Sequence, residues 1–97
     1  MEHIKVEWDD QAVVHMLASH GVTVPEAEEA LVDVERVAQV PDPASRTGSS
    51  DRYIGWSTSR NELRVVIVVH DGDVLYGGNA WPANAKAQHI YNERKGT

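Results

Sequence analysis

The longest apolar segment of the chain covers residues 63–70, in which β-branched residues dominate. Valine and isoleucine have few favoured χ1 rotamers and pack well on a pleated surface, so the pattern predicts a strand. Side chains alternate between the two faces of a strand, and the middle of both faces is apolar here. We therefore expect a central strand covered on both sides, with Arg64 and His70 at its polar ends.

Shorter segments predict the partners of this strand. Residues 52–57 form a candidate neighbour, and Asp71-Gly72 is a two-residue hairpin signal that sends residues 73–76 back alongside the long strand. Gly77-Gly78 then weakens the returning strand, which favours a bulge or bend over a phosphate-binding loop.

Two other extended segments are weaker. The alternation over residues 3–8 predicts a first strand, and residues 37–40 are compatible with either a brief strand or an extended connection. The proline- and serine-rich residues 41–51 are expected to form a mobile loop.

Helical signals appear in three places. Asp9 or Asp10 can cap a helix over residues 11–19, and Thr23 with Glu26 has the spacing of a capping box at the start of a second helix. A third helix is predicted from Pro82 to about residue 95. The acidic residues of the second helix are expected mostly opposite its apolar face or near the positive end of its dipole; they are Glu26, Glu28, Glu29 and Asp33.

The order strand, helix, helix, three strands, helix (β-α-α-β-β-β-α) predicts an α+β domain with a mainly antiparallel sheet of three to four strands packed with helices. The 97 residues suffice for one domain. We expect it to be monomeric or to complete its core against a partner.

Composition narrows the function. The net charge of −6 divides unevenly, because residues 1–45 carry ten acids and two bases whereas residues 46–97 carry five acids and seven bases. A local basic surface on the second half is therefore open to RNA, although scattered solvated charges explain the pattern equally well. The lack of cysteine excludes disulfides, and no signal peptide or membrane-length apolar run is visible, so a cytoplasmic protein is expected.

Several short motifs, taken in order, resemble the BrnT-like toxins of bacterial type II toxin–antitoxin pairs, whose fold is similar to that of RelE ribonucleases. The matching segments cover most of the chain: Glu7-Trp8-Asp9, His20-Gly21-Val22, Glu28-Glu29-Ala30, Pro41-Asp42-Pro43, Arg52-Tyr53-Ile54-Gly55, residues 63–70, Ala80 and Tyr91. The resemblance implies a metal-independent endoribonuclease that acts on mRNA and is neutralised by a partner antitoxin in a hetero-oligomer.

The chain also departs from the pattern of that family. Where the family usually carries an arginine, a lysine and a helix carboxylate, this sequence has Trp81, Pro82 and Ala87, and Tyr76 replaces an earlier arginine. A catalytically degenerate module of the same fold, which acts through protein contacts alone, is therefore the alternative hypothesis.

Cleavage of RNA needs a general base, a cation near the phosphate and an acid for the leaving oxygen. We predict Arg64 and Arg52 as phosphate-binding residues and His70 as an acid–base residue, because an imidazole can both accept and donate a proton. Each also has a plain structural interpretation: exposed cations on a sheet, and a hydrogen-bonded histidine at a strand end.

Four further residues complete the prediction. Lys86 and His89, three positions apart on the last helix, and Trp81 are predicted to contact RNA, whereas Trp56 and Trp81 are predicted to contact the protein partner. Tyr91 is expected to pack in the core, and this structural role is preferred over a catalytic one. The histidine spacing does not favour a metal site, and no cofactor is expected.

Overall fold

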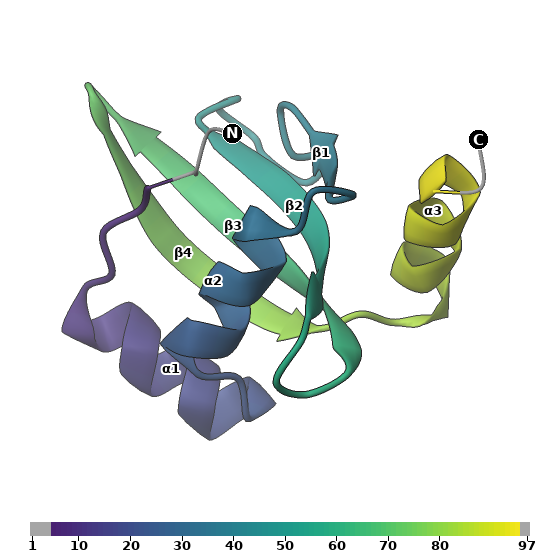
Figure 1. The fold of residues 1–97 in the computed structure, drawn as a ribbon. Coiled ribbons are helices and arrows are strands. Elements are labelled where there is room, and N and C mark those ends of the chain that lie inside the picture. Colours follow the sequence, from purple (N-terminus) through teal and green to yellow (C-terminus); the bar gives the residue numbers. More distant parts are fainter. Residues whose placement is uncertain (1–4, 96–97) are drawn as a thin grey trace.

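The computed structural model describes residues 5–95 and confirms the α+β class (Figure 1). The elements are α1 Asp10–His20, α2 Val24–Val32, β1 Val37–Gln39, β2 Ser50–Ser57, β3 Glu62–Asp71, β4 Val74–Pro82 and α3 Ala85–Lys95. The strands form one antiparallel sheet in the order β1-β2-β3-β4, so the short segment at residues 37–39 is a strand. Among the described residues, no helix has the length and apolar character needed to cross a bilayer.

The strand β3 is an inner strand of the sheet, as its apolar pattern predicts. Val66 and Val68 are buried in the core formed with α1 and α2, which lie on one face of the sheet. Leu63 and Val65 belong to a second core on the opposite face, which includes Tyr91 of α3. We call these two faces the helix-pair face and the α3 face.

The α3 face is only partly covered. The helix α3 packs against β1 and β2 and stands beside that edge of the sheet in Figure 1. Ile67, Val69 and Trp81 are consequently half-buried rather than buried. The prediction that both sides of β3 are covered therefore holds for the first half of the strand and fails on the α3 face of the second half.

The predicted first strand is wrong for the part of it that the structure describes. Residues 3 and 4 lie outside the described range, and Glu7 makes only an isolated parallel bridge to Tyr76. In this bridge the Glu7 N–H donates to Leu75 O at 2.8 Å, and Glu7 O accepts from Gly77 N at 2.8 Å. The segment cannot pair further along β4 because Asp9 already caps α1 through a 2.8 Å bond from Ala12 N.

The boundary between β4 and α3 also differs from the prediction. The strand continues through Gly77-Gly78 to Pro82, and the expected irregularity is a register shift opposite Ile67 and Val68. Helix α3 begins at Ala85 instead of Pro82, because Asn84 Oδ1 caps it by accepting from Ala87 N at 2.9 Å. Pro82 is tolerated at the end of an edge strand, where a missing N–H costs little.

The acidic residues of α2 are the main surprise of the fold. Three of the four point to the sheet, whereas the sequence pattern placed the four mostly opposite the apolar face of the helix or near the positive end of its dipole. Glu26 does lie in the first turn, at that positive end. Glu29 Oε1 accepts from Ser57 Oγ at 2.7 Å and from Ser59 N at 3.1 Å. Asp33, the residue that ends α2, accepts from Trp56 N at 2.8 Å. Hydrogen bonds to these carboxylates thus connect α2 to β2 and to the turn that follows it.

The third carboxylate, Glu26, makes the most buried contact. Its Oε1 accepts from Arg64 Nε at 3.3 Å and Nη2 at 3.2 Å, and Arg64 is only 3% exposed. Its Oε2 accepts from Thr23 N at 3.2 Å, which completes the capping box predicted from the sequence. Arg64 Nη1 donates to Glu62 Oε2 at 2.9 Å, so both ends of the guanidinium are bonded. The expectation that Arg64 is a surface cation is therefore wrong.

Close approach of α2 to the sheet requires a glycine at position 55. A Cβ atom there would lie 2.0 Å from Ala30 O and 2.7 Å from Ala30 C, and these are backbone atoms that cannot rotate away. By contrast, a Cβ at Gly78 would lie 3.0 Å from the Cγ2 of Val69, which is a side-chain atom. The two positions make a matched pair for measuring the contact.

Replacing Glu26 with glutamine is expected to lower the free energy of unfolding by about 3 kcal/mol, because the buried Arg64 loses its buried counter-charge and keeps only the exposed Glu62. Urea denaturation measures this change. Glu28→Gln, an exposed neighbour on the same helix, should change stability by less than about 0.5 kcal/mol. Equal effects of the two substitutions would contradict the assignment.

The same carboxylate gives stability a dependence on pH. Burial raises the pKa of Glu26, but the bonds from Thr23 and Arg64 outweigh it and hold the pKa below its usual range. Its contribution is complete above the unfolded pKa of about 4.3 and is lost as pH falls through the folded value. The pH range from about 6 to about 3 brackets that unfolded pKa. Urea denaturation over this range should therefore show a smaller loss of stability in Glu26→Gln than in the wild type.

Gly55→Ala should destabilise the fold by about 3 kcal/mol through overpacking against the α2 backbone. Gly78→Ala meets only a movable methyl group and should cost much less. Thermal denaturation of the two variants tests the contact, and similar melting temperatures would argue against it.

Candidate functional site

The three residues predicted as catalytic do not form one site. Arg64 is buried on the helix-pair face at the start of β3, and His70 lies at the other end of the same strand. Arg52 belongs to the α3 face, because it pairs with Ile67 across the sheet. Their side chains therefore cannot bind the same phosphate, and each has to be considered in its own surroundings.

His70 is paired with a carboxylate that the sequence did not single out. Its Nε2 lies 2.5 Å from Asp51 Oδ2, and the side chains are 46% and 6% exposed, respectively. Asp51 comes from β2 beside β3, so the pairing of these strands brings the two residues together. An exposed imidazole held by a buried carboxylate is an arrangement used in general acid–base catalysis.

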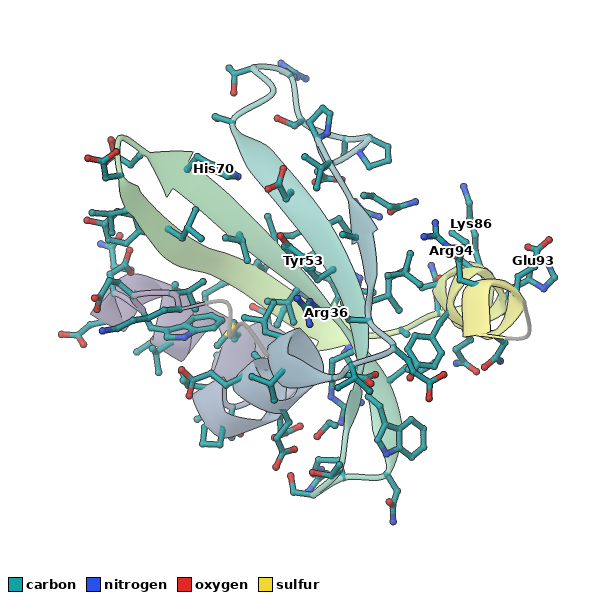
Figure 2. All side chains as sticks on the ribbon, turned by 45° about the horizontal axis from the view of Figure 1, so that its top comes forward. Arg36, Tyr53, His70, Lys86, Glu93 and Arg94 are labelled. Carbon is teal, nitrogen blue, oxygen red and sulfur yellow. The ribbon has the colours of Figure 1, made fainter. Side chains whose placement is uncertain are left out.

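Two further groups lie near this pair on the helix-pair face. Figure 2 shows His70, Tyr53 and Arg36 following one another across this face. Burial and the charge of Asp51 raise the pKa of Tyr53, against the opposing effect of Arg36, so its hydroxyl stays protonated at neutral pH. Arg36 Nη1 donates to Asp33 O at 3.3 Å. The group therefore contains a potential general base, His70, and a potential general acid, Tyr53.

The hollow next to His70 is unfavourable for RNA. It has a volume of about 640 Å³ and lies between the start of α1 and the β3–β4 hairpin. Asp9 and Asp71 line it, and no lysine or arginine does. Because phosphate contacts dominate RNA affinity, carboxylates without cations would repel the backbone.

The α3 face brings together two of the predicted RNA-binding residues, Trp81 and Lys86, with Arg52, which was predicted to bind phosphate in catalysis. The Arg52 guanidinium carbon lies 5.5 Å from the centre of the Trp81 ring, which is within range for a cation–π interaction. Arg52 and Lys86 both line a small cavity of about 110 Å³ between the sheet and the start of α3. Lys86 projects from the first turn of that helix (Figure 2).

Arg52 is held from a second side by the loop between β1 and β2, which ends before Ser50 because residues 50 and 51, expected in the loop, belong to β2. Its Nε lies 2.9 Å from Asp42 Oδ1, which makes an ion pair, but the N–H does not point at the oxygen and forms no hydrogen bond. Asp42 is 6% exposed and is tied to β2 by a 2.8 Å bond from its N–H to Ser50 O. The guanidinium is thus positioned between a carboxylate and an indole ring.

The remaining predicted residues lie elsewhere. His89 is 75% exposed and pairs with Glu93 at 3.2 Å along α3, so it is not part of the Arg52–Trp81 surface. Trp56 is 37% exposed and lines a separate hollow of about 210 Å³ with Pro82 and Gln88. Its proposed contact with a partner stays a prediction. In the described residues, no group of three or more metal-binding side chains is positioned for a metal ion.

Tyr91 is a core residue, as expected. It is 4% exposed, and its hydroxyl donates to Asp33 Oδ2 at 2.7 Å. Burial and this bond to a carboxylate raise the pKa of the phenol well above its ordinary value. Asp33 thereby joins α3 to the end of α2, and Tyr91 is unsuited to proton transfer at neutral pH.

Comparisons with known proteins do not identify the chain: no protein-family model matches it, and no curated protein is significantly similar to it. The interpretation of the two surfaces therefore depends on their geometry.

Sequence reasoning missed Asp51, Asp42 and Tyr53. Asp51 and Tyr53 alternate with Arg52 along β2, so their shared face was readable once His70 was placed on the neighbouring strand. The position of Asp42 depends on the path of the loop, for which the sequence contains no periodic signal.

Tyr91→Phe removes one hydrogen bond to Asp33 and should lower the free energy of unfolding by about 1 kcal/mol. Chemical denaturation measures the loss, and Tyr76→Phe, a half-buried tyrosine of β4, serves as the control. In addition, the tyrosine ionisation that occurs at the highest pH in an absorbance titration of the wild type should be absent in Tyr91→Phe. Persistence of that transition would show that another tyrosine produces it.

Proposed function

We propose that the protein is the toxin component of a bacterial type II toxin–antitoxin pair and that it acts on single-stranded RNA through its α3 face. The observation that carries this proposal is the Arg52 guanidinium carbon lying over the half-exposed Trp81 ring, 5.5 Å from the ring centre, on the face that α3 covers only in part. The sequence resemblance supports the assignment to the toxin class, and the chemistry of the α3 face supports RNA as the ligand.

The chemistry of this surface suits unpaired nucleotides. The Trp81 indole is half-exposed and its ring centre lies 6.1 Å from that of His20. Its exposed part can stack on a base, and such stacking tolerates any sequence. Arginine and lysine beside it provide charge for the phosphodiester backbone. Trp81 and Arg52 belong to different strands, so the indole and the cation are held next to each other by the sheet and not by a long flexible loop, which supports the proposal.

Cleavage is the less supported half of the predicted activity. A metal-independent endoribonuclease needs a base and an acid near the bound phosphate. His70 and Tyr53 have suitable chemistry, but they lie on the opposite face from Arg52. This separation favours the second candidate function, a module of the same fold that binds RNA or a partner protein without cutting RNA.

An antitoxin that covered the α3 face would neutralise either activity. The sheet there is incomplete, because α3 leaves Ile67, Val69 and Trp81 half-exposed. Burial of such apolar and aromatic area is a common basis for stable association, with tryptophan as an anchor. The proposed hetero-oligomer would then mask the same residues that contact RNA.

The test uses labelled single-stranded RNA with the full-length protein in EDTA. Trp81→Ala and Arg52→Gln should each weaken binding about tenfold, as expected for loss of one stacked base or one phosphate contact. Fluorescence anisotropy gives the affinity, and gel electrophoresis of the same samples shows whether the RNA is cut.

Two controls define the outcome. Trp56→Ala removes a tryptophan from a different hollow, and Arg60→Gln removes an equal charge from an arginine beside Glu26. Binding that is insensitive to Trp81 and Arg52, or equally sensitive to the controls, would refute the RNA surface. Binding without cleavage would identify the protein as the non-cutting module.

A further inference from the structure

The small cavity beside Arg52 is lined by polar groups that can donate hydrogen bonds and by no carboxylate. Gln39 comes from β1, Arg52 from β2, and Asn84 and Lys86 from the start of α3. Ile54, Ala87 and Ile90 form an apolar floor. Side chains from three separate elements thus converge on one hollow of about 110 Å³.

Most of these donors are available. Among the described residues, neither Lys86 nor Gln39 has a hydrogen-bonding or ion-pair partner for its side chain. Asn84 uses its Oδ1 to cap α3, which leaves the amide nitrogen free for another acceptor. Arg52 Nε is buried 2.9 Å from Asp42 Oδ1, so the donors of Arg52 that remain for a ligand are its two terminal guanidinium nitrogens. The cavity therefore offers N–H groups without acceptors.

The charge around the cavity is positive even after Asp42 is counted. Arg52 and Lys86 contribute two positive charges, and Asp42 cancels one of them. The first turn of α3 adds a partial positive charge, because its N–H groups have no helical partners. A tetrahedral oxyanion satisfies both the donors and the charge.

We infer that this cavity is a phosphate-binding subsite, formed by Gln39, Arg52, Asn84 and Lys86, which holds one phosphate of a nucleotide whose base stacks on Trp81. The inference rests on the proposed function and deepens it, because it defines the unit of RNA that is recognised. The volume is far below the roughly 300 Å³ of a pocket for a whole small molecule, so it accommodates the phosphate and excludes the nucleoside.

The arrangement also orders the nucleotide. Arg52 lines the cavity and lies over the Trp81 ring, so the bound phosphate and the indole that carries the base would both be next to one guanidinium. An internal RNA phosphate and the terminal phosphate of a free nucleotide present the same oxygens to these donors. The experiment separates these two sources.

Titrations of the full-length protein followed by ¹H–¹⁵N NMR test the subsite. Inorganic phosphate should shift the Arg52 Nε–H signal and the side-chain amide signals of Gln39 and Asn84. Uridine 5′-monophosphate should bind more tightly than phosphate and also shift the Trp81 indole signal, whereas uridine should shift the indole signal alone. Lys86→Gln and Arg52→Gln should each weaken phosphate binding at least fivefold, and Arg60→Gln should not.

A single-stranded oligonucleotide without terminal phosphates identifies the source. Shifts of the same signals show that an internal phosphate is bound, whereas shifts with uridine 5′-monophosphate alone show that a free terminal phosphate is bound; either result supports the subsite. Absence of shifts with phosphate and with the nucleotide would overturn it, as would tighter binding of a phosphoserine peptide. If RNA affinity still falls in Trp81→Ala, the subsite fails and the RNA surface stands; if RNA does not bind at all, the proposed function itself fails.

Discussion

The fold depends on the attachment of α2 to the sheet through carboxylates. Glu26, Glu29 and Asp33 follow one side of the helix and each reaches a different part of the sheet or of the turn beyond it. The Glu26–Arg64 pair is the most buried of these contacts, so its partners depend strongly on each other. An apolar contact would tolerate sliding of the helix, whereas charged and directional bonds fix its position along β2 and β3. Gly55 then allows the helix backbone to approach without a gap.

This attachment assigns different tasks to the two faces of the sheet. The helix-pair face contains the larger core and the carboxylates of α2, and its exposed part bears the His70–Asp51 pair. The α3 face contains a smaller core and retains uncovered strands with Arg52 and Trp81. The α2 carboxylates Glu26 and Glu29 therefore lie on the face away from the proposed RNA surface, whereas Asp42 of the same acidic half contacts Arg52 on the α3 face.

Local patterns predicted most of the elements. The β-branched run gave β3, the Asp71-Gly72 pair gave its hairpin, and Thr23 with Glu26 gave the start of α2. Long-range partners were not predictable in the same way. Arg64 looked like an exposed strand-end cation because nothing local shows that Glu26, 38 positions away, will cover it. The sequence likewise suggested one catalytic group from Arg64, His70 and Arg52, whereas strand alternation and burial separate all three.

The position of Arg52 has a consequence for the entropy of binding. A free arginine side chain loses up to about 2 kcal/mol of rotamer entropy when it is immobilised. Arg52 has already lost part of this freedom in the unliganded fold, since Asp42 holds one side of the guanidinium and Trp81 the other. A ligand that meets it therefore encounters a preorganised cation, and more of the interaction energy remains as affinity.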